Sequence, residues 1–340
     1  MQYLALYVVS TVLFFQALRF GQVKGLSEMV VSAVNYVVAA VLALMMLVAS
    51  DLLGYDQHIS NVALFGGAAL GTGYFVYLFV LFRAYNYFGI GITMALVQVG
   101  TSLTAVYAWA VYGDRIGFLQ WIGLAVIPAA LLLMRPQEQK ATDQTANEKG
   151  DAESQTECST LRPKRNALAV LAVFLLATLM QTGFAVIHDA VQRFDPHVEL
   201  GFWGYSAAVF TAAGVLNVGY VLLFERRRYP IGTCTVGSLA GLANLSLCVF
   251  VVFALDVVGP TIVLPTAAVA IIGINLVVAK LYWKETITRQ QYVGLACTFL
   301  VVLMMNLDLS GDAMVADEKS VSGAAVQVDG ATQTNVLVDG

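Results

Sequence analysis

The chain of 340 residues is 59% hydrophobic and 12% charged, with a formal net charge of −4 and a mean hydropathy of +0.76. An ordinary soluble domain of this length is far less apolar, so the composition excludes water as the main solvent of the fold. The four cysteines have no paired spacing, which gives no sign of a disulfide framework or a cysteine metal site.

Ten stretches without Asp, Glu, Lys or Arg follow one another along the chain. A helix needs roughly 20 residues to cross a hydrocarbon core of about 30 Å, and each stretch reaches or approaches that length. Strand-like alternation is absent, so each stretch predicts a transmembrane helix. The first has no basic residue before it and no Ala-x-Ala site after it, which predicts an uncleaved helix rather than a signal peptide. The stretches cover residues 2–18, 29–49, 62–82, 86–111, 116–134, 166–187, 200–224, 231–255, 257–279 and 290–307.

Two polar segments divide this apolar chain. Residues 135–165 are dense in charged and small polar residues, and residues 308–340 are rich in acids, Gly, Ala, Ser and Thr. Both compositions are typical of disordered chain. The predicted domains are a five-helix repeat at 1–134, a flexible polar tether at 135–165, a second five-helix repeat at 166–307 and a disordered acidic tail at 308–340. Because five is an odd number, the second repeat is predicted to lie upside down relative to the first.

Residues 66–125 recur, much altered, at 237–296. A shift of 171 positions superposes many small or polar residues, and a compensated gap near Arg83 lowers the shift to 170 where Gly89 meets Gly259. A long fixed period in a membrane chain indicates a transporter built from fused repeats, with the substrate between them near the bilayer midplane. The pairs at 171 include Gly66 with Gly237, Asp114 with Glu285, Gln120 with Gln291 and Gly123 with Gly294.

Two stretches resemble the end of an EamA-type repeat in the drug/metabolite transporter superfamily: YGDRIGFLQWIGLAVIPAALLLM at 112–134 and YWKETITRQQYVGLACTFLVVLMM at 282–305. That motif has an acid beside a basic residue and a polar helix start, followed by Gln, an aromatic or aliphatic residue and Gly. The resemblance implies a ten-helix inverted-repeat carrier for small metabolites that works by alternating access. It also implies that both termini lie in the cytoplasm.

The basic residues predict the opposite orientation. Every Lys and Arg except Arg115, Arg193 and Lys319 lies in a connection that follows an odd-numbered span. Cytoplasmic connections carry the excess of basic residues, so this distribution predicts a cytoplasmic tether and termini outside the cytoplasm. Both orientations stay open, and the agreement between the two halves favours the charge rule.

Polar side chains inside the spans are candidates for lining a cavity, because burying an unpaired amide or hydroxyl in hydrocarbon is unfavourable. Gln98, Ser102 and Ala105 are spaced i, i+4 and i+7, which predicts one stripe on the helix at 86–111. Hydrogen bonding between packed helices is the competing explanation for each residue. The candidate substrate cavity comprises Ser10, Thr11, Tyr74, Tyr77, Gln98, Ser102, Gln181, Asn244 and Asn275.

Asp114 and Glu285 occupy equivalent turns just ahead of the fifth and tenth spans. A carboxylate there stabilises the start of the helix by about 0.3–1 kcal/mol, which predicts a helix cap. A gating ion pair with the neighbouring Arg115 or Lys284 is the alternative.

Pro260 and Pro265 lie at the start and in the interior of the ninth span. An interior proline removes one backbone hydrogen bond and displaces the carbonyl four residues earlier. The two prolines are therefore candidates for a hinge, with a passive kink in a packed bundle as the alternative.

None of the ten spans contains a carboxylate, so coupling of transport through a buried acid is not expected. A lining of amides, hydroxyls and phenols predicts a secondary carrier or facilitator that moves a small neutral or zwitterionic metabolite across the membrane by alternating access. A sugar or nucleotide-sugar carrier of the same superfamily is the alternative.

Other classes of function fit less well. All three histidines lie at span ends or in connections, and no Ser-His or HExxH arrangement occurs, which argues against a membrane-embedded enzyme. A non-transporting scaffold or sensor that uses the acidic tail is the remaining alternative. We expect no metal or other cofactor and no nucleic-acid partner. The expected partners are a small-molecule substrate and the lipid of a bacterial inner membrane, and a homodimer is left open.

Overall fold

A computed structural model of the protein describes residues 1–53, 61–102, 104–112, 116–134, 171–180, 202–225, 229–258 and 260–307, and the single residues 182, 183, 186, 187 and 190. Within these ranges the secondary structure is helical and contains no strand. The helices are α1 (Gln2–Val23), α2 (Glu28–Leu52), α3 (Asn61–Thr101), α4 (Thr104–Tyr112), α5 (Phe118–Met134), α7 (Phe202–Phe224), α8 (Ile231–Val258), α9 (Pro260–Leu281) and α10 (Arg289–Leu307). A further helical segment covers Leu171–Met180.

By length and composition, five of these helices can cross a membrane: Gln2–Val23, Glu28–Leu52, Asn61–Gly100, Trp203–Phe224 and Ile231–Ala254. Large apolar side chains such as Met45, Leu179 and Leu222 are exposed on the outside of the bundle, where lipid is their natural solvent. These features indicate an all-α integral membrane protein, as the composition predicts. Shorter apolar helices cover Phe118–Met134, Leu171–Met180, Thr266–Leu281 and Arg289–Met305.

Local capping sets where α2 begins. Ser27 precedes the helix in an extended conformation, and its side chain accepts a hydrogen bond from the Val30 amide at 3.3 Å. Glu28 adds a carboxylate to the first turn, where the helix dipole favours it. The Ser27 hydroxyl also donates to the carboxylate of Glu225, which directly follows α7. The start of α2 is therefore tied to the end of α7.

The predicted spans at 62–82 and 86–111 are wrong in their boundaries. A single element, α3, runs through the expected connection and is interrupted at Gly89, whose φ of 74° and ψ of 174° suit only glycine. The helix then ends at Thr101, and α4 resumes at Thr104. Gly100 and the hydroxyl residues after it favour this ending, because such residues propagate a helix poorly.

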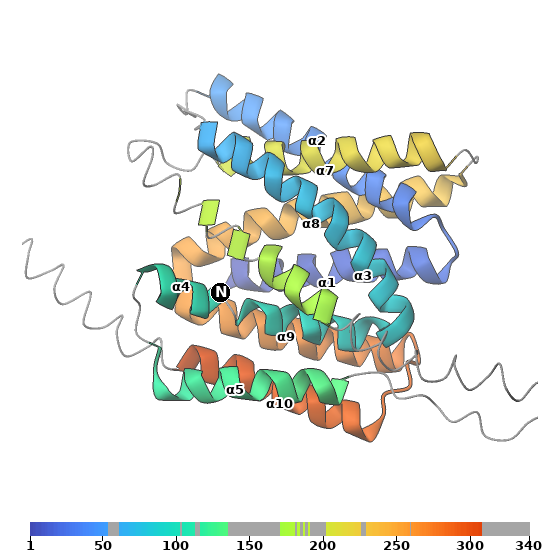
Figure 1. Ribbon diagram of the computed structural model, residues 1–340. Helices are drawn as coiled ribbons and strands as arrows, with labels where there is room; N and C mark the ends of the chain where they lie inside the picture. Colours follow the sequence, from blue (N-terminus) through green and yellow to red (C-terminus); the bar gives the residue numbers. More distant parts are fainter. Residues whose placement is uncertain are drawn as a thin grey trace, which may run out of the picture.

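Helices from the first and second parts of the chain pack against one another in one bundle (Figure 1). The main contacts join α2 with α7, α1 with α8, and α5 with α10, while α3 packs against both α7 and α9. The core between them is closely filled by side chains such as Leu18, Tyr36, Phe82, Tyr85 and Ile272, each at most 2% exposed.

Glycines allow the closest helix contacts. In the α3–α7 contact, Gly71 faces the carbonyl of Val209, where a side chain would not fit. In the α2–α8 contact, Gly241 faces the carbonyl of Asn35 in the same manner. These close approaches add the van der Waals contact on which helix association in lipid depends.

Candidate functional site

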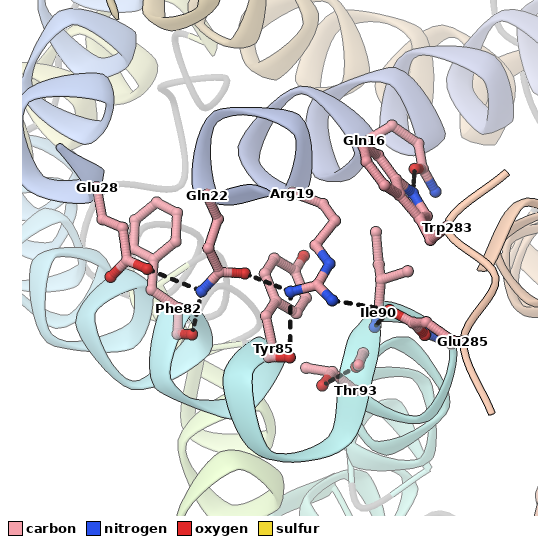
Figure 2. Close-up of polar contacts among 12 residues, drawn as sticks. Gln16, Arg19, Gln22, Glu28, Phe82, Tyr85, Ile90, Thr93, Trp283 and Glu285 are labelled. Carbon is pink, nitrogen blue, oxygen red and sulfur yellow. Dashed lines mark hydrogen bonds and ion pairs between the residues drawn. The ribbon is translucent and has the colours of Figure 1, made fainter. Parts of the chain in front are cut away.

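One end of the bundle carries two neighbouring chains of hydrogen-bonded polar side chains (Figure 2). Gln16, Arg19 and Gln22 follow one another at intervals of three residues, so they lie along one side of the last turns of α1. Their partners come from α2, from the part of α3 before Gly89, from α9, and from the connection between α9 and α10. We call this set the Arg19 network; it comprises Gln16, Arg19, Gln22, Glu28, Asn275, Trp283 and Glu285 with the backbone groups that they bind.

Glu285 is the centre of the network. Its carboxylate pairs with the Arg19 guanidinium, with 3.1 Å between Nη2 and Oε1. The same oxygen accepts a hydrogen bond from the Ile90 amide at 2.9 Å, and Oε2 accepts one from the Gly91 amide at 3.4 Å. Both charged side chains are largely buried, at 15% and 13% exposure. The interruption at Gly89 starts a new helix at Ile90, whose first amides have no partner in the preceding turn and attract an anion.

The end of α9 turns Glu285 toward that helix start. Lys284 has a φ of 53°, which is left-handed backbone. The Glu285 amide then donates to the carbonyl of Ala279 at 2.9 Å, closing the end of the helix. Ala279 in turn packs against Gly91 across the α3–α9 contact. Backbone geometry therefore places the carboxylate, and Arg19 completes the site.

Arg19 and Gln22 also bind the part of α3 that precedes Gly89. Arg19 Nη1 donates to the Tyr85 carbonyl at 3.2 Å and to Gln22 Oε1 at 2.6 Å. Gln22 Nε2 donates to the Phe82 carbonyl and to Glu28 Oε1, both at 2.8 Å. Arg19 thus contacts the carboxylate of Glu285 directly and that of Glu28 through the amide of Gln22. The end of α1 binds the part of α3 before Gly89 directly and the part after it through Glu285.

Gln16 extends the network to α9 and accounts for one predicted site residue. Trp283 Nε1 donates to Gln16 Oε1 at 2.7 Å, and Gln16 Nε2 donates to Asn275 Oδ1 at 2.8 Å. Asn275 is fully buried and donates to the Ile271 carbonyl of its own helix. The structure therefore places Asn275 in a chain of hydrogen bonds with Gln16 and Trp283.

Three other predicted cavity residues lie in the interior near Tyr36. The Tyr36 hydroxyl donates to the Tyr74 carbonyl at 3.4 Å, and the rings of Tyr74 and Tyr77 lie edge to face at 6.2 Å. Asn244 Nδ2 of α8 donates to Oδ1 of Asn35, the residue before Tyr36 on α2, at 3.3 Å. The structure thus brings Tyr74 and Tyr77 together beside Tyr36 and places Asn244 against the preceding residue of α2.

The remaining predicted residues lie in separate places. Ser10 and Thr11 are buried in α1, where the Thr11 hydroxyl donates to the Tyr7 carbonyl at 2.8 Å. Gln98 is buried in α3 after Gly89, and Ser102 is buried in the turn that follows α3 rather than on a continuous helix. Pro260 is the first residue of α9, and Pro265 lies in its second turn. Gln181 and Asp114 lie outside the described residues.

Glu285 does not have the contacts that the sequence predicts, which were a cap on the tenth span or an ion pair with Lys284. The start of α10 is capped by its own residues: the Thr288 amide donates to Gln291 Oε1 at 2.9 Å, and the Gln291 amide donates to Thr288 Oγ1 at 3.3 Å. Glu285 caps the helix that begins at Ile90, and its ion-pair partner is Arg19 rather than Lys284. A carboxylate satisfies whichever helix start lies nearest in space, which local sequence does not reveal.

Comparisons with known proteins bear on the fold alone. No family model matches the sequence, and neither does any curated protein. One solved crystal structure of a protein is similar over 90% of this chain and 99% of that chain, with a TM-score of 0.53 and 13% sequence identity.

Among the described residues, no group of three or more His, Cys, Asp or Glu side chains is arranged to hold a metal ion.

Proposed function

We propose that the protein is a secondary carrier or facilitator that moves a small neutral or zwitterionic metabolite by alternating access between two inverted five-helix halves. The observation that carries the proposal is the paired packing of α5 and α10. Gly123 of α5 packs against Met305, and Gly294 of α10 packs against Met134. Each residue of one contact lies 171 positions from its counterpart in the other. The start of each helix meets the end of the other, so the two helices are antiparallel, which supports a two-fold relation between the halves.

Two further pairs of contacts support the same relation. Gly71 packs against Val209 of α7, and Gly241 packs against Val38 of α2. Val38 and Val209 are 171 positions apart and Gly71 and Gly241 are 170 apart, so equivalent helices meet through residues that agree to within one position of the repeat. The start of α5 also repeats a capping bond of α10. The Gly117 amide donates to Gln120 Oε1 at 3.1 Å, and the counterpart amide of Thr288 donates to Gln291 Oε1.

The Arg19 network fits the role of a gate in such a carrier. It joins α1 and α3 of the first half to the α9–α10 connection of the second half at one end of the bundle. Separation of the halves at this end requires Arg19 and Ile90 to leave Glu285. We propose that this separation opens the carrier on that face and that the neutral side chains around Tyr36 contact the substrate.

Flux through liposomes tests the proposed function. Metabolite profiles of cells that lack or overproduce the protein should reveal a compound whose level changes, and purified protein should then carry that compound into liposomes. If no compound that changes in the cells crosses the liposomes, the protein is not a carrier.

Replacement of Gln98 by alanine is expected to weaken transport while leaving the amount of folded protein nearly unchanged. Gln98 is a long, buried amide in the middle of a predicted span, where its counterpart in the second half is Ala268. Packing alone would accept alanine at this position. Flux and membrane yield should be measured together. Normal flux, or loss of the folded protein, would identify Gln98 as a packing residue.

The face closed by the Arg19 network is expected to be cytoplasmic. Lys24 and Lys284 lie in connections at this end of the bundle, Lys280 lies in the last turn of α9 and Arg289 begins α10, and basic residues at span ends are retained in the cytoplasm. In a variant without native cysteines, a cysteine at Gly150 should resist a membrane-impermeant thiol reagent in intact cells. A cysteine at Gln2 is the control and should react. The reverse pattern would establish the orientation that the family resemblance implies.

A further inference from the structure

Buried polar atoms without a hydrogen-bond partner concentrate on three helices that touch. Within the described part of the chain, Ser32 Oγ and Asn35 Nδ2 of α2, Asn217 Oδ1 of α7 and Thr233 Oγ1 of α8 have no such partner. All four residues are 0% exposed. Native proteins satisfy nearly all buried polar atoms, so a group of exceptions requires an explanation.

The contacts of α2 with α7 bring Asn217 to the level of Ser32 and Asn35. Ser27 at the start of α2 bonds to Glu225 after the end of α7, and Tyr36 packs against Gly214 of α7. The two helices are therefore antiparallel. Asn217 lies between Gly214 and Glu225, so it lies level with the segment of α2 between Ser27 and Tyr36, which contains both unpartnered groups of that helix.

Helix α8 closes the same region from another side. Gly237 and Gly241 pack against the carbonyls of Val31 and Asn35, so α8 runs beside this segment of α2. Asn244 Nδ2 donates to Asn35 Oδ1 at 3.3 Å, which leaves the Asn35 amino group without a partner. The region lies between α2 of the first half and α7 and α8 of the second.

We propose that Ser32, Asn35 and Asn217, with Asn244, bind the substrate through its hydroxyl groups, and that the substrate is a neutral polyol or sugar. Asn35 offers an amide donor, Asn217 offers a carbonyl acceptor, and the Ser32 hydroxyl can do either. A hydroxyl group both donates and accepts, so it matches this set. A carboxylate alone only accepts and would leave Asn217 unpaired, while an ammonium alone only donates and would leave Asn35 unpaired. A zwitterion would pair with both, but its two charges would be buried without an opposite charge, since none of the four residues is charged.

This inference rests on the proposed function, because the site must open before a ligand can enter. The unpartnered atoms are closed off in the present conformation. Movement of α2 away from α7 and α8, as alternating access requires, would expose them. Packing does not explain their presence, since an apolar side chain of similar size would avoid the cost of unpaired polar atoms.

Replacement of Ser32 by alanine separates the two explanations. The Ser32 hydroxyl has no partner among the described residues, so its loss should leave the thermal stability of the empty protein unchanged or slightly higher. Loss of one neutral hydrogen bond to the ligand should weaken binding about five-fold. Ser50→Ala is the matched control. Ser50 is buried on the same helix, but its hydroxyl donates to the Leu47 carbonyl at 2.8 Å. The control should bind as the wild type does.

The assay uses purified protein and liposomes with labelled mannitol, myo-inositol and glucose as neutral probes, alanine as a zwitterion and succinate as an anion. Binding of a neutral probe that Ser32→Ala weakens and Ser50→Ala does not would uphold the site. Unchanged binding by Ser32→Ala, or binding of alanine or succinate alone, would overturn it. Binding of a neutral probe without flux would uphold the site and overturn the carrier function. Absence of binding by every probe would overturn the site, whatever the flux of other compounds shows.

Discussion

Replacement of Gly89 by alanine is expected to destabilise the folded protein substantially. The backbone conformation at Gly89, with φ at 74° and ψ at 174°, costs a residue with a side chain about 1–3 kcal/mol. The new Cβ would also collide with the carboxylate of Glu285. That carboxylate must then leave the amides of Ile90 and Gly91, so the backbone strain and the loss of the helix cap add together.

Thermal unfolding in detergent measures this effect, and Gly219→Ala provides the control. Gly219 lies inside α7 with nothing within 4 Å of the position that its Cβ would occupy. Alanine is favoured over glycine in a helix interior by about 0.8–1.0 kcal/mol, so the control should be slightly stabilised. Equal stability of the Gly89 and Gly219 variants would show that α3 tolerates an ordinary residue at its interruption and that the cap on Ile90 contributes little.

Removal of either charge in the Arg19–Glu285 pair is expected to open the end of the bundle that the Arg19 network closes. Breaking one partner of a buried ion pair costs roughly 3 kcal/mol, because the remaining charge is left in a poorly solvated place. Arg19→Ala and Glu285→Ala should each lower the unfolding temperature. In a variant without native cysteines, each should also raise the reactivity of a cysteine placed at Thr93, which is fully buried beyond Gly89. Lys280→Ala is the control, since that lysine is exposed and interacts with Tyr292.

An exchange of the two charges distinguishes a simple ion pair from a helix cap. The variant with Arg19→Glu and Glu285→Arg restores opposite charges, but it places a cation at the start of the helix that begins at Ile90. A helix start repels a cation, and an arginine cannot accept the hydrogen bonds of the Ile90 and Gly91 amides. We therefore expect little rescue of stability or of cysteine protection. Full rescue would show that the amides contribute nothing and that charge attraction alone closes this end.

The long apolar helices were predictable, and their ends were less so. The charge-free stretch at 29–49 predicts α2 closely, because the start of that helix is set by a local cap at Ser27. The stretch at 2–18 stops short of Val23, where α1 ends, because Arg19 was expected to leave the membrane. Arg19 remains in the helix since a carboxylate 266 residues away pairs with it. A charge marks the end of a span only where solvent is its best partner.

The candidate site shows the same limit. The sequence shows two signals: a lone glycine at position 89, and the interval of three between Gln16, Arg19 and Gln22. Nothing in the sequence joins either signal to Glu285. Amide side chains inside the spans are a better guide to candidate residues than the glycine or the charges. The rule that selected Asn244 and Asn275, a polar side chain inside an apolar span, applies equally to Asn35 and to its unpartnered neighbours. Applied to every span, it finds the residues between α2, α7 and α8.

The hydrogen bond from the Ile90 amide to Glu285 cannot be repeated at the equivalent position of the second half. The repeat places Pro260 opposite Ile90, and a proline has no amide hydrogen to donate. A hydrogen bond to a charged group contributes about 1.5–3 kcal/mol, and 1.4 kcal/mol changes a population ratio about ten-fold. In the carrier that we propose, the two closed states would therefore not be equivalent. The difference would bias the resting population toward closure at the face where Arg19 lies, and so toward an opening on the opposite side of the membrane.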